Sequence, residues 1–157
     1  MTWIRQKLAS CGDRIACHEA GKAWSYAEFI KLIDHAATQL PSKGVAVIEV
    51  QAPTTIEGLA MLLAVGETGH IALPLPAELP EAEQDKRRLV AKSSQLYNQL
   101  EGSGLVLFSS GTSGEPKGML HNLDALLGRY KNLSDRKDHS LLLLLIDHIG
   151  GLDSAFR

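Results

Sequence analysis

The most informative segment of the chain runs from Leu105 to Gly118 and reads LVLFSSGTSGEPKG. Its apolar start is typical of a buried strand, and the part that follows is rich in glycine, serine and threonine. Glycine lets backbone N–H groups come close to a ligand, the hydroxyl groups can donate hydrogen bonds, and Lys117 adds a positive charge. A loop of this kind has the donors that a polyphosphate needs.

The order of these residues differs from that of a Walker P-loop. A Walker motif ends in Gly-Lys-Ser or Gly-Lys-Thr, whereas here Lys117 follows Pro116 and precedes Gly118. The spacing therefore excludes a GTPase-like or kinase-like P-loop. By composition alone, the segment also fits a flexible turn between two elements, or a loop of a generic α/β domain that holds some other anion. Both alternatives stay open at this point.

An amphipathic helix is expected upstream, from Trp24 to Leu40. Its apolar residues recur at helical steps, Ser25 stands where an N-cap would be, and Glu28 completes the pattern of a capping box. Pro41 follows and is expected to end the helix.

A strand, a helix and a second strand are expected between this helix and the loop. Val45 to Val50 is a β-branched run, Glu57 to Val65 reads as a helix with Thr54 or Thr55 as its cap, and Ile71 to Leu75 is extended. This order implies two parallel strands joined by a crossover helix.

The remaining segments complete an α/β pattern. They are a surface helix from Glu81 to Leu100, a strand from Leu105 to Phe108, a loop from Ser109 to Gly118, a helix from Leu123 to Lys131 capped by Asn122, and a central parallel strand from Leu141 to Ile146. The predicted fold class is α/β, with three layers and a largely parallel sheet flanked by helices.

Composition and charge exclude several classes of protein. The chain has 157 residues and a formal net charge of -2, without a basic stripe for nucleic acid. Cys11 and Cys17 indicate neither a disulfide framework nor zinc, and no apolar run approaches the roughly 18 residues of a membrane span. No secretion signal is evident, so a cytoplasmic location is expected. Five of the six histidines show no metal-ligand spacing and read as ordinary surface or core residues: His18, His35, His70, His121 and His139.

Leu105 to Gly118 closely resembles the signature of the adenylate-forming superfamily, the AMP-binding acyl-CoA synthetases, luciferases and peptide-synthetase adenylation domains. Three other stretches resemble that superfamily in the same order. Trp24 to Phe29 is similar to an early helix start, and Val45 to Leu75 to its strand, helix and strand. Ile146 to Leu152 is similar to the next motif, in which a histidine or another aromatic residue lies beside the acyl pocket.

The resemblance implies roles for individual residues. The β- and γ-phosphates of ATP would be held by Ser109, Ser110, Gly111, Thr112, Ser113 and Gly114. Thr112 would also lie near Mg²⁺, and Lys117 would counter charge on the departing pyrophosphate. His148 would line the junction of the adenylate and the thiol channel, while Gly150 and Gly151 leave room for the substrate.

The resemblance also implies an activity. Such an enzyme uses ATP to convert a carboxylic acid into an acyl-adenylate and then passes the acyl group to a thiol, that of CoA or of a carrier-bound pantetheine. Complete relatives are several times longer, so residues 1–157 are expected to be a partial AMP-binding N-terminal domain without the C-terminal lid domain. We expect weak ATP binding, no catalysis by the isolated chain, and self-association or a complementing chain. The alternative is a non-catalytic, degenerate or partner-complemented module that keeps a phosphate-binding loop.

Overall fold

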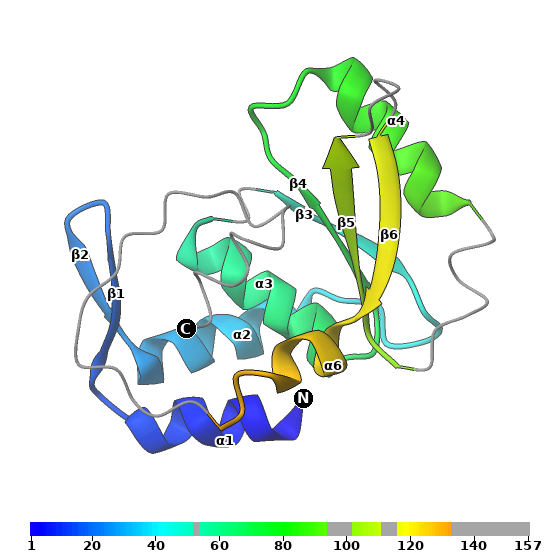
Figure 1. Cartoon of the computed structure of the whole chain (residues 1–157). Helices are drawn as coiled ribbons and strands as arrows, with labels where there is room; N and C mark the ends of the chain where they lie inside the picture. Colours follow the sequence, from blue (N-terminus) through cyan, green and yellow to red (C-terminus); the bar gives the residue numbers. More distant parts are fainter. Residues whose placement is uncertain (52–53, 94–101, 111–115, 133–157) are drawn as a thin grey trace.

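The computed structural model describes residues 1–51, 54–93, 102–110 and 116–132. These residues form helices and strands in the following order (Figure 1): α1 Thr2–Cys11, β1 Ile15–Glu19, β2 Lys22–Ser25, α2 Tyr26–Thr38, β3 Val47–Gln51, α3 Ile56–Glu67, β4 Ile71–Leu75, α4 Glu81–Lys92, β5 Gly104–Ser110, β6 Pro116–Asn122 and α6 Leu123–Gly128. The predicted strand from Leu141 to Ile146 lies outside the described residues.

The main sheet has the strand order β3-β4-β5-β6. Strands β3, β4 and β5 are parallel, and α3 connects β3 to β4, which confirms the predicted crossover. Strand β6 runs antiparallel to β5. The three-layer, largely parallel α/β fold is therefore as predicted.

Strand β6 corrects one expectation. The sequence placed all of Ser109 to Gly118 in a loop, but Ser109 and Ser110 end β5, and Pro116 begins β6. The glycine and proline content concealed this strand. Proline is tolerated at the first position of a strand, where the ladder does not need its missing N–H group.

Side chains cap three helices where the sequence predicted caps. Ser25 and Glu28 form the predicted capping box of α2. Thr55, rather than Thr54, caps α3 by accepting a hydrogen bond from the backbone of Gly58, and Asn122 Oδ1 accepts from the backbone N of Ala125 in α6. Two helices end earlier than predicted. Helix α6 ends at Gly128 instead of Lys131, and α4 ends at Lys92 instead of Leu100.

Three N-terminal elements, helix α1 and strands β1 and β2, were not predicted. Helix α1 lies beside α2 and α3, and Arg5 joins it to them through Glu67 at 2.6 Å and Asp34 at 2.7 Å. Strands β1 and β2 form a small hairpin that Figure 1 shows apart from the main sheet. Its turn residues, Ala20 and Gly21, both have positive φ, as a tight hairpin turn requires.

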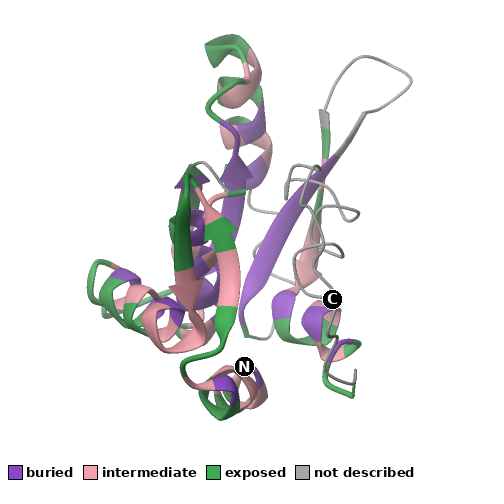
Figure 2. Cartoon of the chain, turned by 90° about the vertical axis from the view of Figure 1, so that its left-hand side faces the viewer, coloured by how far each residue is buried: buried purple, intermediate pink, exposed green. Residues whose placement is uncertain are grey.

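Apolar cores lie on both faces of the sheet. Strand β5 contributes to each, because successive side chains point to opposite faces: Leu105 and Leu107 join the core under α1, α2, α3 and α6, whereas Val106 and Phe108 join the core under α4. Figure 2 shows β5 as a buried ribbon. Strand β5 is therefore packed on both of its faces up to Phe108, just before the predicted loop.

Helix α4 comes unusually close to β6 at Gly118. A Cβ atom at this glycine would lie 2.7 Å from Val90 of α4 and 3.2 Å from the ring of Phe108. The last glycine of the loop signature is therefore required for packing. It lets the helix rest directly on the hairpin.

We predict that Gly118→Ala lowers the free energy of unfolding by about 1–3 kcal/mol, because the added methyl group overpacks the contact with Val90. Urea denaturation would measure the loss. Gly128→Ala is the control, since nothing lies within 4 Å of a Cβ atom there. In the double variant with Val90→Ala, part of the loss should be recovered. An unchanged unfolding midpoint for Gly118→Ala would contradict this packing.

The capping box of α2 predicts a pH dependence. Hydrogen bonding of the Glu28 carboxylate to the backbone of Ser25 holds the pKa of Glu28 below its ordinary value of 4.5. The carboxylate therefore contributes stability that is fully present above the unfolded pKa and is lost as the pH falls through the folded one. The stability gap between wild type and Glu28→Gln should be largest near neutral pH and shrink as the pH falls from about 5 to about 3. A gap that is constant over this range in urea titrations would contradict the assignment.

Candidate phosphate-binding site

The pairing of β5 with β6 determines the geometry of the predicted phosphate loop. Phe108 pairs with Gly118, Ser109 with Lys117, and Ser110 with Pro116. Lys117 thus lies directly opposite the first serine of the loop signature. Two residues that the sequence marked as phosphate contacts come together at the loop end of the hairpin.

The structure tests the position of only part of the predicted site. Ser109, Ser110 and Lys117 lie on described strands. The other predicted phosphate and magnesium contacts are outside the described residues, as are the predicted acyl-pocket residues: Gly111, Thr112, Ser113, Gly114, His148, Gly150 and Gly151. Their roles stay predictions.

Lys117 is exposed at the base of the loop. Its neighbour Gly118 faces Val90 and Phe108 under α4, so strand alternation directs Lys117 to the opposite face of the sheet. A lysine ammonium group on a flexible stem is suited to a moving or departing anion, because it acts as a point charge without a fixed fork. This position fits the predicted role of Lys117.

A second cation lies at the base of the same hairpin. Arg87 of α4 is 8% exposed, and its guanidinium carbon lies 4.8 Å from the ring centroid of Phe108. The Glu83 carboxylate is 3.4 Å from Arg87 Nε. Sequence analysis missed this residue because α4 reads as a charged surface helix. The only signal was an arginine at helical spacing from Val90 and Ala91, which also face the sheet.

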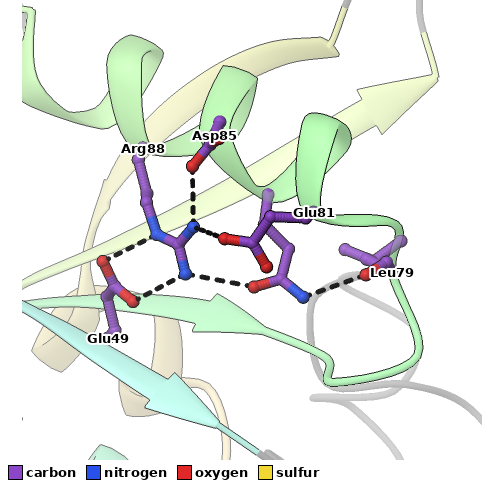
Figure 3. Close-up of polar contacts among 6 residues, drawn as sticks. Glu49, Leu79, Glu81, Asp85 and Arg88 are labelled. Carbon is purple, nitrogen blue, oxygen red and sulfur yellow. Dashed lines mark hydrogen bonds and ion pairs between the residues drawn. The ribbon is translucent and has the colours of Figure 1, made fainter.

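The next residue of α4, Arg88, fastens the helix to the far edge strand β3. Figure 3 shows its guanidinium between Glu49 of β3 and two acids of α4. The distances are 3.0 Å to Glu49, 2.9 Å to Glu81 and 2.8 Å to Asp85, and Gln84 accepts at 3.1 Å. These bonds, chiefly the one to Glu49, raise the pKa of Arg88 above its ordinary value. The guanidinium of Arg88 is therefore bound by side chains of α4 and β3.

Other polar features lie away from the hairpin or have structural partners. A shallow pocket lined by Met1, Arg5 and Gly66 lies near Leu123, beyond the opposite end of β6 from the loop. His70 is buried, contacts the carbonyl of Pro41 at 2.9 Å and accepts from the backbone N of Ala46 at 3.3 Å. Of the two predicted alternatives, a surface or a core residue, His70 is the core residue.

Among the residues that the structure describes, no group of histidine, cysteine, aspartate and glutamate side chains could hold a metal ion. None of the helices described there is long and apolar enough to cross a membrane.

Comparison with curated proteins identifies peptide synthetases. No protein-family model matches the chain. It is 26% identical over 153 residues to a probable non-canonical nonribosomal peptide synthetase, CymA, of Salinispora arenicola, and 29% identical over 85 residues to the nonribosomal peptide synthetase dtxS1 of Metarhizium robertsii. These matches cover 85% and 52% of the chain but only 2% and 1% of the relatives.

Solved structures agree over nearly the whole chain. O-succinylbenzoate CoA synthetase (MenE) from Bacillus subtilis, solved with its acyl-adenylate intermediate, has a TM-score of 0.71 at 20% identity, covering 98% of this chain and 52% of that one. The N-terminal subdomain of Klebsiella oxytoca NpsA has a TM-score of 0.70 at 18% identity, with 99% and 49% covered. The chain therefore spans about half the length of these structures. It has the fold of the N-terminal part of the adenylate-forming enzymes, the superfamily that its loop sequence predicted.

Proposed function

We propose that this chain is the N-terminal, ATP-binding part of an enzyme that activates a carboxylic acid as its acyl-adenylate. The observation that supports this most directly is the register of β5 and β6, which sets Lys117 opposite Ser109 at the end of the hairpin. Solved neighbours carry ligands of the same reaction: MenE has been solved with ATP and a magnesium ion and with an acyl-adenylate.

The proposed chemistry is a displacement at phosphorus. A carboxylate oxygen of the acid attacks the α-phosphate of MgATP, the bond between the α-phosphate and the bridging oxygen breaks, and pyrophosphate leaves with the electron pair. The protein has little bond-making chemistry of its own to supply. Its task is to hold the polyphosphate in line and to neutralise the charge that develops on the leaving group.

The hairpin residues would divide this task. Ser109 and Ser110, at the end of β5, would offer hydroxyl and backbone donors, and Thr112 in the loop would approach the magnesium ion of MgATP. Lys117, on the returning strand, would balance the charge on pyrophosphate as it departs. Fixed donors at the end of a paired strand need little reorganisation during the reaction.

The acyl end of the reaction would involve the predicted motif after the leucine-rich strand. His148 would separate the adenylate from the incoming thiol, and Gly150 and Gly151 would leave space for the acyl chain. The acceptor would be the thiol of CoA or of carrier-bound pantetheine. The free thiols of Cys11 and Cys17 fit a reducing compartment such as the cytoplasm.

We predict that MgATP binds this chain weakly and that Lys117→Gln weakens the binding about tenfold or more, since a hydrogen bond to a charged group contributes about 1.5–3 kcal/mol. Isothermal titration calorimetry with MgATP, and with inorganic pyrophosphate as competitor, would measure both effects. Lys131→Gln is the matched control, because Lys131 is also exposed but lies after α6, beyond the other end of β6.

Equal affinities of wild type and Lys117→Gln for MgATP would contradict the proposed role of Lys117. Equal losses in the Lys117 and Lys131 variants would indicate a nonspecific effect of net charge. MgATP binding that pyrophosphate does not displace would place the nucleotide elsewhere on the molecule. Any of these results would argue against the hairpin as the phosphate site.

A further inference from the structure

Arg88 uses every hydrogen-bond donor of its guanidinium group. Its Nε and Nη2 atoms donate to the two carboxylate oxygens of Glu49 in β3, at 3.0 and 3.3 Å. Its Nη1 atom donates to Glu81 at 2.9 Å and to Asp85 at 2.8 Å, and Nη2 also donates to Gln84 at 3.1 Å. These bonds occupy all the N–H groups that an arginine has. Of these partners, Glu49 is the one that lies outside α4 (Figure 3).

The bond between Arg88 and Glu49 has the geometry of an ion pair that contributes to stability. A bidentate contact between an arginine and a carboxylate is directional, and further carboxylates form a network around this one. Both side chains are also partly shielded from water, because Arg88 is 22% exposed and Glu49 is 34% exposed. The pair therefore ties α4 to the edge strand β3.

The apolar face of α4 is narrow. Val90 and Ala91 are its apolar residues in the core beneath the helix, whereas Leu89 is 72% exposed. A helix of a globular protein is normally oriented by a wider apolar stripe. The bond from Arg88 to Glu49 gives α4 a second attachment to the sheet, and this attachment helps to fix which residues of the helix face β5 and β6.

Helix α4 in turn holds the loop-proximal part of β6. Val90 lies so close to Gly118 that a Cβ atom at the glycine would be 2.7 Å away. On the other face of β6, Lys117 and Met119 are exposed, and α6, which also contacts the strand, begins beyond its far end at Leu123. Within the described residues, the loop-proximal part of β6 is thus held by β5 in the sheet and by α4 on one face (Figure 1).

We propose that Arg88 is a positioning residue for the candidate phosphate site: its bond to Glu49 fixes α4 on the sheet, and α4 then holds the Lys117 end of β6 against β5. The role at the site rests on the proposed function, whereas the coupling from Glu49 to the hairpin is a property of the free chain. Because the attachment exists before a ligand binds, the hairpin needs less reorganisation when the anion arrives.

Amide hydrogen exchange of the full chain tests the coupling without a ligand. Arg88→Met keeps an apolar stem and removes the donors. It should speed the exchange of the hairpin amides at the loop end, residues 108–110 and 117–118, by about two- to fivefold, which is the range that a well-formed exposed ion pair supplies. Exchange at the opposite end of the hairpin, residues 104–105 and 121–122, should stay the same, because α4 does not hold that end.

Matched controls separate this coupling from a general loss of stability. Glu49→Gln removes the carboxylate on β3 and should reproduce the local effect, whereas Glu81→Gln makes the same change of charge within α4 and should have a smaller one. Arg5→Met removes an arginine that is also bound by two carboxylates, but these join α1 to α2 and α3. This variant should leave exchange at the loop end of the hairpin unchanged.

A double variant tests whether Val90 transmits the effect. In a Val90→Ala background, the effect of Arg88→Met should shrink, because the contact that carries it to Gly118 is already weakened. Calorimetry with inorganic pyrophosphate tests the role at the site. Arg88→Met should lower the affinity about two- to fivefold, and Arg5→Met should leave it unchanged.

The coupling is overturned if loop-end exchange is unchanged in Arg88→Met, if it rises equally at both ends of the hairpin, or if Glu49→Gln and Glu81→Gln have equal effects. Additive effects of the Val90 and Arg88 substitutions would overturn transmission through Val90. Should Arg88→Met fail to fold, Glu49→Gln decides by the same comparisons.

Equal pyrophosphate affinities of wild type and Arg88→Met would overturn the role of Arg88 at the site. Absence of pyrophosphate and MgATP binding by wild type would instead overturn the proposed function, and the role at the site with it. The exchange rates would still decide whether Glu49 and the hairpin are coupled, so the two failures are distinguishable.

Discussion

The antiparallel pairing of β5 with β6 is the constraint on which the candidate site depends. Each end of the loop signature lies on one of these strands, and their register brings Lys117 opposite Ser109. The sheet behind them is built from parallel strands that need a crossover helix, so β5 is fixed by β4 and the core on both faces. This pairing fixes the two ends of the loop signature relative to each other.

Helix α4 contributes to the site as well as to the third layer of the fold. It rests on Gly118 through Val90, it covers Phe108 with Arg87, and Arg88 fixes it to β3. Adjacent arginines on one helix thus face different environments, one over the ring of Phe108 in β5 and one in an acidic network at the sheet edge. This division explains why a charged helix covers an apolar face.

Much of the fold could be predicted because local signals agree with the final structure. The capping box of Ser25 and Glu28, the β-branched run before α3 and the apolar start of β5 each specify their element with few alternatives. Strand β6 could not be predicted in this way. Pro116, Lys117 and Gly118 resemble loop residues, and they form a strand only because β5 offers a partner. Arg87 was missed for a related reason, since its burial depends on a tertiary contact with Phe108.

Whether the β5–β6 hairpin binds the polyphosphate is tested most directly by titrating the isotopically labelled chain with inorganic pyrophosphate and with MgATP while the backbone amide resonances are followed. If the β5–β6 hairpin binds the polyphosphate, the shifts will be concentrated between Phe108 and Gly118, with none in β3. Shifts centred on the Met1 and Gly66 pocket, or spread evenly over exposed lysines, would contradict the claim that the β5–β6 hairpin binds the polyphosphate.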